Sequence, residues 1–186
     1  MKRLFAAVRI SPDENYLKSF RIMRSGLRSE AIKWVEERNI HITIKFFGET
    51  EERLIPGISD SLSGISQNTG PLNFCLSGLG IFGSSYQPRV LWSGIVPHEQ
   101  LSSLMKRTQK EMEKHGFESD RQNLIPHLTL GRIKFLKDKE LFRKVLEINK
   151  NIRSEPMIVN DCILFESILR KEGPEYNILE KFPFVK

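Results

Sequence analysis

The feature that most restricts how this chain can fold is a short alternating pattern that occurs twice, as His41-Ile42-Thr43-Ile44 and as His127-Leu128-Thr129-Leu130. On a β-strand, successive side chains point to opposite faces, so each copy places a histidine and a threonine on one face and two aliphatic residues on the other. With four histidines and five threonines in 186 residues, a histidine two residues before a threonine is expected only about 0.1 times by chance. The repetition therefore predicts two strands, each with one buried face and one polar face.

Apolar residues at three- and four-residue spacing predict helices between these strands. We expect helices over residues 13–26, 54–65, 98–115 and 138–148, and strands over residues 4–10, 40–47, 72–81, 90–95, 124–133, 157–169 and 176–182. The strands lack the Val/Ile-saturated runs of a doubly wound parallel sheet, and no Pro/Ser-rich linker divides the chain. These observations predict a single α+β domain over residues 1–186 with largely antiparallel sheets.

Composition indicates the class of partner and the compartment. The net charge of +6 and the pI near 9.4 favour anionic partners, with nucleic acid first among them. No apolar run approaches the roughly 18 residues of a membrane span, and the apolar start of the chain is broken by Arg9 without a cleavage site, so it predicts a strand and not a signal peptide. Cys75 and Cys162 each lie in an apolar stretch, and we expect buried free thiols in a reducing cytoplasm. A monomer is the expectation for a chain of this size.

The polar side of each copy carries groups that can open a five-membered cyclic phosphate with water. One imidazole can take a proton from the water and the other can protonate the departing ribose oxygen, because an ordinary imidazole pKa lies near 6.5. Such assistance is typically worth about 10²–10⁴-fold per group. His41 and His127 are therefore the candidate acid and base, and the hydroxyls of Thr43 and Thr129 are candidate donors to the phosphoryl oxygens. The spacing does not say which histidine is the acid.

Two cations flank the copies. Lys45 lies in phase with His41 and is a candidate phosphate contact, with a solvated strand lysine as the alternative. Arg132 is an attractive phosphate or base contact. Strict alternation from His127 would put Arg132 on the opposite face, so its role depends on the strand ending or twisting there.

Aromatic side chains near these strands could stack a nucleobase. The candidates are Phe47, Phe82, Tyr86 and Trp92, of which Trp92, together with Phe46, is expected to belong to the core instead. The remaining histidines, His98 and His115, lie at predicted helix ends and are expected to be structural or solvated.

Other classes of function fit the pattern less well. A zinc site needs three or four closely spaced ligands, and the chain has no His-x-His, His-Glu-x-x-His or Cys-x-x-Cys motif, so we expect no metal ion and no cofactor. There is also no Gly-x-Ser-x-Gly elbow, and neither cysteine adjoins a histidine. A non-catalytic module that grips RNA ends remains an alternative, although two complete His-x-Thr pairs exceed what binding requires.

At these residues the chain resembles the two-histidine phosphoesterase superfamily, specifically the RNA 2′,3′-cyclic phosphodiesterases once named 2′-5′ RNA ligases. The resemblance covers nearly the whole chain and rests on residues 3–6, 41–49, 88–92, 126–132 and 173–176. It implies a bilobal fold with a central cleft, two sheets with flanking helices and one motif in each lobe.

For the chemistry, the resemblance implies hydrolysis of RNA 2′,3′-cyclic phosphate ends to 2′-phosphomonoesters. It makes His41 the proton donor and His127 the proton acceptor, and Arg132 matches the family's motif. Reverse 2′-5′ ligation, or a different cyclic or 2′-5′ nucleotide as substrate, would keep the same fold.

Overall fold

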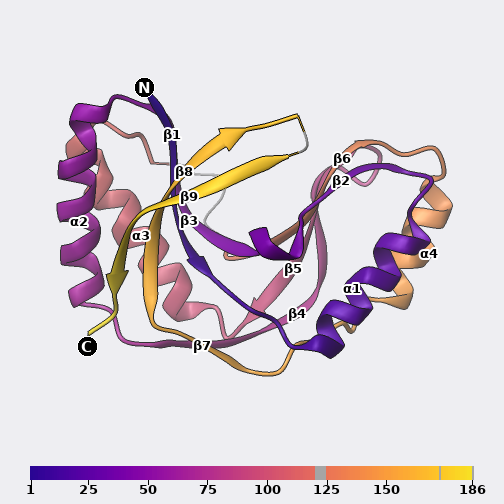
Figure 1. Cartoon of the computed structure of the whole chain (residues 1–186). Coiled ribbons are helices and arrows are strands. Elements are labelled where there is room, and N and C mark those ends of the chain that lie inside the picture. The colour runs from indigo at the N-terminus through magenta and orange to yellow at the C-terminus, as the bar shows by residue number, and fades with distance from the viewer. Residues whose placement is uncertain (120–124, 172, 186) are drawn as a thin grey trace.

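Two antiparallel sheets, each covered on its outer face by a pair of helices, make up the structure (Figure 1). The structure is a computed structural model and describes residues 1–119, 125–171 and 173–185. The strand start expected at Leu124 and the turn expected at Glu172 lie outside the described residues. The expected α+β class with antiparallel sheets is confirmed.

Each sheet contains strands from distant parts of the chain. The four-stranded sheet has the order β3 (His41–Thr50), β1 (Lys2–Arg9), β8 (Asp161–Leu169) and β9 (Pro174–Pro183). The five-stranded sheet has the order β2 (Ala31–Trp34), β6 (Leu128–Phe135), β5 (Pro88–Val96), β4 (Leu72–Gly83) and β7 (Met157–Val159). All neighbouring strands in these orders pair antiparallel.

The helices divide between the two sheets. α2 (Ile55–Gln67) and α3 (Glu99–Met112) pack against each other and contact the four-stranded sheet. α1 (Glu14–Gly26) contacts α4 (Lys139–Ile148), and the Phe20 ring of α1 packs edge-on against Trp34 of β2, with 5.7 Å between ring centroids. Three short 3₁₀ turns complete the elements: η1 (Glu37–Asn39), η2 (Glu52–Leu54) and η3 (Glu113–His115).

Local signals explain where several elements begin and end. The Asp13 carboxylate accepts hydrogen bonds from the backbone N–H groups of Asn15 and Tyr16, which would otherwise lack partners in the first turn of α1. Asp138 caps α4 in the same way through Leu141. Gly116 follows η3 with φ of 83°, a left-handed conformation that glycine adopts without steric cost.

The chain crosses between the two sheets repeatedly. It runs from β1 to β2, back to β3, and then to the β4–β5 hairpin; after β7 it returns to the four-stranded sheet for β8 and β9. Neither sheet is therefore built from one continuous segment. The expected strand over residues 157–169 was wrong in this respect, because β7 and β8 lie in different sheets. The short strand β2 was not predicted.

A β-bulge follows each His-x-Thr motif. β1 pairs Ala7 with Thr43 and Ala6 with Lys45, and so skips Ile44. β5 pairs Trp92 with Thr129 and Leu91 with Gly131, and so skips Leu130 in the same position of the second motif. A bulge inserts one extra residue into a strand and reverses which side chains face which way beyond it. The residues that directly follow the fourth motif residue therefore change face in both strands, and in β3 a second register shift follows at Phe47.

Both cysteines are buried free thiols, as expected. The Cys75 thiol donates to the backbone carbonyl of Val96, and burial raises the pKa of Cys162 to about 12. Among the described residues, no helix has both the length and the apolar character that spanning a membrane requires.

Candidate active site

His41 is the first residue of β3, and its ring is held in one orientation. Its Nδ1 lies 2.7 Å from the backbone carbonyl oxygen of Asn39. Because a carbonyl oxygen can only accept, Nδ1 carries the hydrogen and donates it. The other nitrogen, Nε2, is left for a substrate, as an acceptor when the ring is neutral and as a donor when it is protonated.

His127 repeats this arrangement immediately before β6. Its Nδ1 lies 2.7 Å from the carbonyl oxygen of Ile125. In both motifs the bond therefore reaches the carbonyl two residues earlier, and both rings adopt the same tautomer. This shared bond is a second correspondence between the motifs, beyond the His-x-Thr pattern itself.

The two histidines lie within electrostatic reach of each other. β3 and β6 contact one another. Burial lowers the pKa of the His41 imidazole below its ordinary value of 6.5, although the hydrogen bond to Asn39 raises it; the positive charges of Arg132, Arg9 and His127 lower the pKa further. Burial also lowers the pKa of His127, and Arg132 contributes to that shift. Both shifts favour the neutral form of the two imidazoles in the free protein.

We call the sheet face with His41 and Thr43 and the sheet face with His127 and Thr129 the two motif faces. Thr43 and Thr129 are half-buried. Each follows its histidine by two residues on the strand, so its hydroxyl lies on the same face as the imidazole. The structure thus brings the four predicted motif residues onto two neighbouring faces, while their chemical roles stay a prediction.

Arg132 lies on the motif face of the five-stranded sheet. It pairs with Val90, which shares a face with Trp92, and Trp92 pairs with Thr129. Strict alternation would have turned Arg132 away, and the bulge at Leu130 turns it back. Its charge lowers the pKa of both histidines, so a cation stands near both imidazoles.

Lys45 does not lie in phase with His41, and this expectation is corrected. The bulge at Ile44 moves Lys45 to the core side of β3, where its side chain is 5% exposed. Its ammonium donates to the backbone carbonyl of Glu118, 2.6 Å away. The structure therefore gives Lys45 a role in holding the segment after η3 and not one on the motif face.

Aromatic rings pack directly against His41. The Phe5 ring centroid lies 5.0 Å from the imidazole, and Tyr176 of β9 meets the imidazole edge-on, with 5.3 Å between centroids. Phe5 stacks in turn on Phe165, at 5.0 Å. These contacts bury one side of His41, and burial is the largest cause of its lowered pKa.

A second aromatic pair packs against His127. Phe82 meets the imidazole edge-on at 4.7 Å, and Trp92 lies 6.1 Å away. Trp92 was expected in the core; it is half-buried, covers Gly80 of β4, and reaches the motif face. Phe82 and Trp92 are the two aromatic candidates that the structure places beside a motif histidine.

The other aromatic expectations differ from the structure. Phe46 was expected in the core, but the bulge at Ile44 puts it on the motif face, and it is 48% exposed. Phe47 is buried and packs edge-on against Phe117 at 5.1 Å, so it cannot stack a base. Tyr86 is 77% exposed in the connection between β4 and β5.

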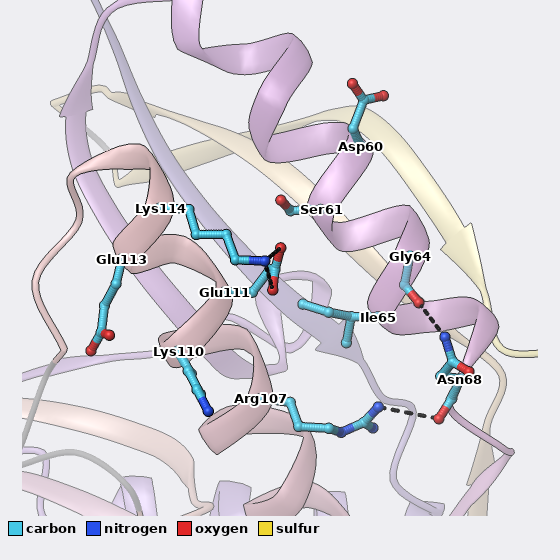
Figure 2. Close-up of a pocket in the computed structure, with 10 residues that line it drawn as sticks. All are labelled: Asp60, Ser61, Gly64, Ile65, Asn68, Arg107, Lys110, Glu111, Glu113 and Lys114. Carbon is cyan, nitrogen blue, oxygen red and sulfur yellow. Dashed lines mark hydrogen bonds and ion pairs between the residues drawn. The ribbon is translucent and has the colours of Figure 1, made fainter.

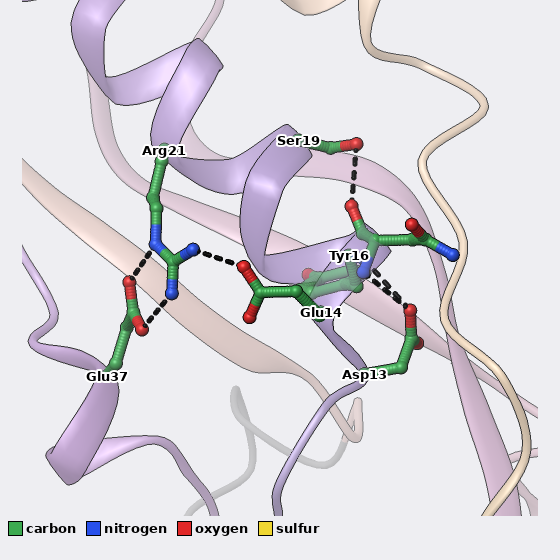
Figure 3. Close-up of polar contacts among 7 residues, drawn as sticks. Asp13, Glu14, Tyr16, Ser19, Arg21 and Glu37 are labelled. Carbon is green, nitrogen blue, oxygen red and sulfur yellow. Dashed lines mark hydrogen bonds and ion pairs between the residues drawn. The ribbon is translucent and has the colours of Figure 1, made fainter.

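η1, the 3₁₀ turn that precedes His41, is linked to α1 by ion pairs of Arg21 (Figure 3). The Arg21 guanidinium donates through Nε and Nη2 to the two carboxylate oxygens of Glu37, each at 2.7 Å. Nη1 donates to Glu14. Because Glu37 begins η1, which ends at Asn39, this bidentate pair fixes the backbone whose carbonyl orients the His41 ring.

One known family model matches this chain in two consecutive segments. The model described as LigT like Phosphoesterase matches residues 10–92 and again residues 94–176, one match for each motif. This chain belongs to the LigT-like phosphoesterase family. The resemblance noted from the doubled motif is confirmed at the level of the family.

Relatives of this LigT-like chain align over nearly its whole length. An RNA 2′,3′-cyclic phosphodiesterase of Thermotoga maritima is 30% identical over 184 residues, or 98% of this chain and 95% of that protein. The protein of the same name from Archaeoglobus fulgidus is 33% identical over 180 residues, or 97% of this chain and 99% of that protein.

Solved structures share the fold. TT0787 of Thermus thermophilus superposes with a TM-score of 0.78 at 23% identity, covering 98% of each chain. E. coli LigT, solved in complex with 3′-AMP, superposes with a TM-score of 0.75 at 21% identity, covering 100% of this chain and 99% of that one.

A separate hollow of about 1130 Å³ lies between α2 and α3, on the side of the LigT-like fold that carries neither motif (Figure 2). Among its lining residues, Arg107 donates to the backbone carbonyl of Asn68, and Lys114 donates to Glu111. Nearby, the His115 ring covers Gly57 and its Nε2 lies 2.8 Å from the Ser61 hydroxyl, so this histidine is structural, as expected.

Sequence reasoning did not assign roles to Phe5, Tyr176 or Arg9, which all influence His41. Arg9 pairs directly with His41 across β1 and β3. No local signal in the sequence could have found these three residues, because their position depends on which strands pair. In the part of the chain that the structure describes, no three His, Cys, Asp or Glu side chains gather as metal ligands would.

Proposed function

We propose that this chain hydrolyses RNA 2′,3′-cyclic phosphate ends to 2′-phosphomonoesters, with His41 as proton donor and His127 as proton acceptor. The observation that carries the proposal is the pair of imidazoles, each held by an Nδ1–carbonyl bond and each left with Nε2 for substrate. The names of its relatives from Thermotoga maritima and Archaeoglobus fulgidus support the same substrate.

The reaction balances with these two groups. Nε2 of His127 takes a proton from water as the water oxygen attacks phosphorus, and the bond between phosphorus and the 3′ oxygen breaks. Nε2–H of His41 gives its proton to that departing oxygen, so the products are a 2′-phosphomonoester and a 3′-hydroxyl. His41 ends neutral and His127 ends protonated, and exchange with solvent restores the starting state.

A lowered pKa favours the neutral imidazole. This form suits His127 as the base, whereas His41 can act as the acid only when bound substrate favours its protonation. A neutral His127 is ready to act as a base. His41 must be protonated to act as an acid, and burial and neighbouring cations oppose this in the free protein. The negative charge of the bound phosphodiester favours the protonated imidazole, so substrate itself helps to prepare the acid.

The neutral and cationic groups on the motif faces would stabilise the transition state. The hydroxyls of Thr43 and Thr129 can donate to the non-bridging phosphoryl oxygens, and Arg132 supplies positive charge where negative charge accumulates. Phe82 and Trp92 lie beside His127 and would flank the terminal base. Run in reverse, with an RNA 5′-hydroxyl in place of water, the same groups would form a 2′-5′ linkage.

The proposal also takes the protein to act as a monomer without a metal ion in the cytoplasm, where Cys75 and Cys162 stay reduced. None of the chemical steps above requires a Lewis acid, since protons are moved by imidazoles. Activity abolished by a strong chelator would contradict this part of the proposal, and size-exclusion chromatography with light scattering would test the monomer.

The decisive experiment is product analysis with a short RNA that ends in a 2′,3′-cyclic phosphate. We expect a 2′-phosphate product, and we expect His41→Gln and His127→Gln each to lower kcat by at least about 10²-fold. His98→Gln is the matched control, because His98 is exposed and the one side-chain hydrogen bond described for it is with Ser102. Tight binding of the RNA by wild-type protein without any turnover would replace the enzyme with an RNA-end binding module.

A further inference from the structure

Phe46 and Arg3 form an exposed stacked pair on the motif face of the four-stranded sheet. The guanidinium carbon of Arg3 lies 4.8 Å from the centroid of the Phe46 ring. Phe46 is directly opposite Phe5 across the strands, and Phe5 contacts His41, so all of these side chains share one face. A half-exposed aromatic ring beside an arginine is the combination that stacks unpaired nucleobases.

Phe46 and Arg132 occupy equivalent places in the two halves of the site. Each lies five residues after its motif histidine, and each is returned to the motif face by the bulge at the fourth motif residue. The second strand uses this place for a cation beside the histidines. The first strand uses it for an aromatic ring, and Arg3 from β1 supplies the cation above it.

Among the ring contacts described, Phe46 meets neither motif histidine, whereas Phe5 contacts His41 and Phe82 contacts His127. Along the backbone, five residues of strand separate Phe46 from His41, roughly 15 Å at about 3.3 Å per residue once the bulge has shortened the path. The ribose that carries the cyclic phosphate holds its own base much closer to the phosphorus. Phe82 and Trp92, which touch or approach His127, lie where that terminal base would be.

A cyclic phosphate closes the 3′ end of an RNA, so every further nucleotide lies on its 5′ side. We propose that Phe46 and Arg3 bind a base and phosphate of this 5′ segment, so that the protein favours single-stranded oligonucleotides over cyclic mononucleotides. The ring of Phe46 stacks the base, and Arg3, whose exposed ion pair with Glu49 spans 3.7 Å, attracts the adjacent phosphate. This inference rests on the proposed function, and it concerns the nucleotides on the 5′ side of the cyclic phosphate, which the motif residues do not contact.

The test compares kcat/KM for adenosine 2′,3′-cyclic phosphate with kcat/KM for an adenosine trinucleotide that ends in the same group. Wild-type protein should favour the trinucleotide, and Phe46→Ala should reduce this preference about tenfold, as expected for the loss of one stacked base. Phe46→Trp should retain the preference because it keeps an aromatic surface. Arg3→Gln should reduce the preference and also weaken its dependence on salt, because one phosphate contact is lost.

The control is Phe135→Ala, which removes an exposed phenylalanine from β6 of the other sheet. It should leave the preference as in wild type. Equal kcat/KM for the two substrates in wild-type protein would overturn the inference. So would an equal loss on both substrates in Phe46→Ala, because that result would indicate a structural role for the ring.

Binding separates this inference from the proposed function. If wild-type protein hydrolyses neither substrate, the proposed function fails, and the same comparison is made by fluorescence anisotropy with the trinucleotide and mononucleotide 2′-phosphates. Weaker trinucleotide binding by Phe46→Ala, with Phe46→Trp close to wild type, would uphold the stacking site. Unchanged binding would remove it.

Discussion

Gly80→Ala should disturb His127 without touching it. Gly80 pairs with Trp92 across β4 and β5, and the Trp92 indole lies over the glycine. A Cβ added at Gly80 would lie 2.2, 2.4 and 2.6 Å from three indole atoms. The backbone φ of Gly80 is not among the positive values, so the substitution acts through this overlap and not through backbone strain.

The size of the disturbance follows from these distances. Ordinary contact begins at 3.4 Å, so the nearest indole atom must retreat by at least 1.2 Å. Phe82 limits the retreat, since it lies 5.2 Å from Trp92 and 4.7 Å from His127 between ring centroids. A displacement of about 1 Å at a catalytic group can cost about 10²-fold in rate, and overpacking typically costs about 1–3 kcal/mol of stability.

We therefore expect Gly80→Ala to lower kcat for a cyclic mononucleotide by about 10- to 100-fold, with a folded protein of lower melting temperature. Gly64→Ala in α2 is the matched control, because a Cβ there meets nothing within 4 Å. It should keep full activity and raise stability by about 0.5–1 kcal/mol, since alanine is the better helix former.

A second substitution distinguishes this mechanism from general damage. Trp92→Phe reduces the ring that covers Gly80, so the double variant should recover part of the activity that Gly80→Ala loses. Near-ultraviolet circular dichroism of the single variant Gly80→Ala should report a changed tryptophan environment. Wild-type kcat in Gly80→Ala, or purely additive losses in the double variant, would refute the link between Trp92 and His127.

Three further outcomes are expected. Protonated His41 is lost as pH rises through its lowered pKa, so kcat/KM should fall on the alkaline side at a lower pH than an ordinary imidazole would give. Arg132→Gln removes a charge that lowers both histidine pKa values, so it should move this alkaline limb to higher pH. An alkaline limb at the wild-type pH would show that Arg132 does not act on the histidines. Thr43→Val and Thr129→Val should each lower kcat by up to about 10²–10³-fold, measured at saturating substrate, and unchanged rates in both would exclude the threonines. Arg21→Met should lower kcat severalfold, and the melting temperature should hardly change because the lost ion pairs are exposed. Arg143→Met breaks a comparable exposed ion pair in α4, and an equal loss of kcat in that variant would contradict the prediction.

The doubled motif and the main helices could be predicted from the sequence because both depend on local periodicity. The Asp13 and Asp138 caps and the Gly116 stop are also local signals, and the structure contains all three. The two motif histidines could be found in the same way, since each motif carries its own alternation. That the two motifs belong to one site could be inferred only from the resemblance to a known family.

The faces of Lys45, Phe46 and Arg132 could not be predicted, because a bulge is a property of two paired strands and not of one. The adjacent rings Phe46 and Phe47 were the one available hint, since strict alternation cannot bury both. The same reason explains why the sequence predicts a single strand where the structure has β7 and β8. An apolar run shows that a segment is buried, but it does not show which sheet receives it.

The repeated crossing of the chain between the sheets means that the two halves with one motif each are not independent units. The boundary between residues 10–92 and 94–176 falls inside β5. β1 and β3, on the N-terminal side of this boundary, share a sheet with β8 and β9 on its C-terminal side. A fragment with one motif would leave open strand edges in both sheets. Co-expressed fragments divided in the exposed turn before β5 would have to associate before either could fold, so each histidine would be positioned only by a complete partner.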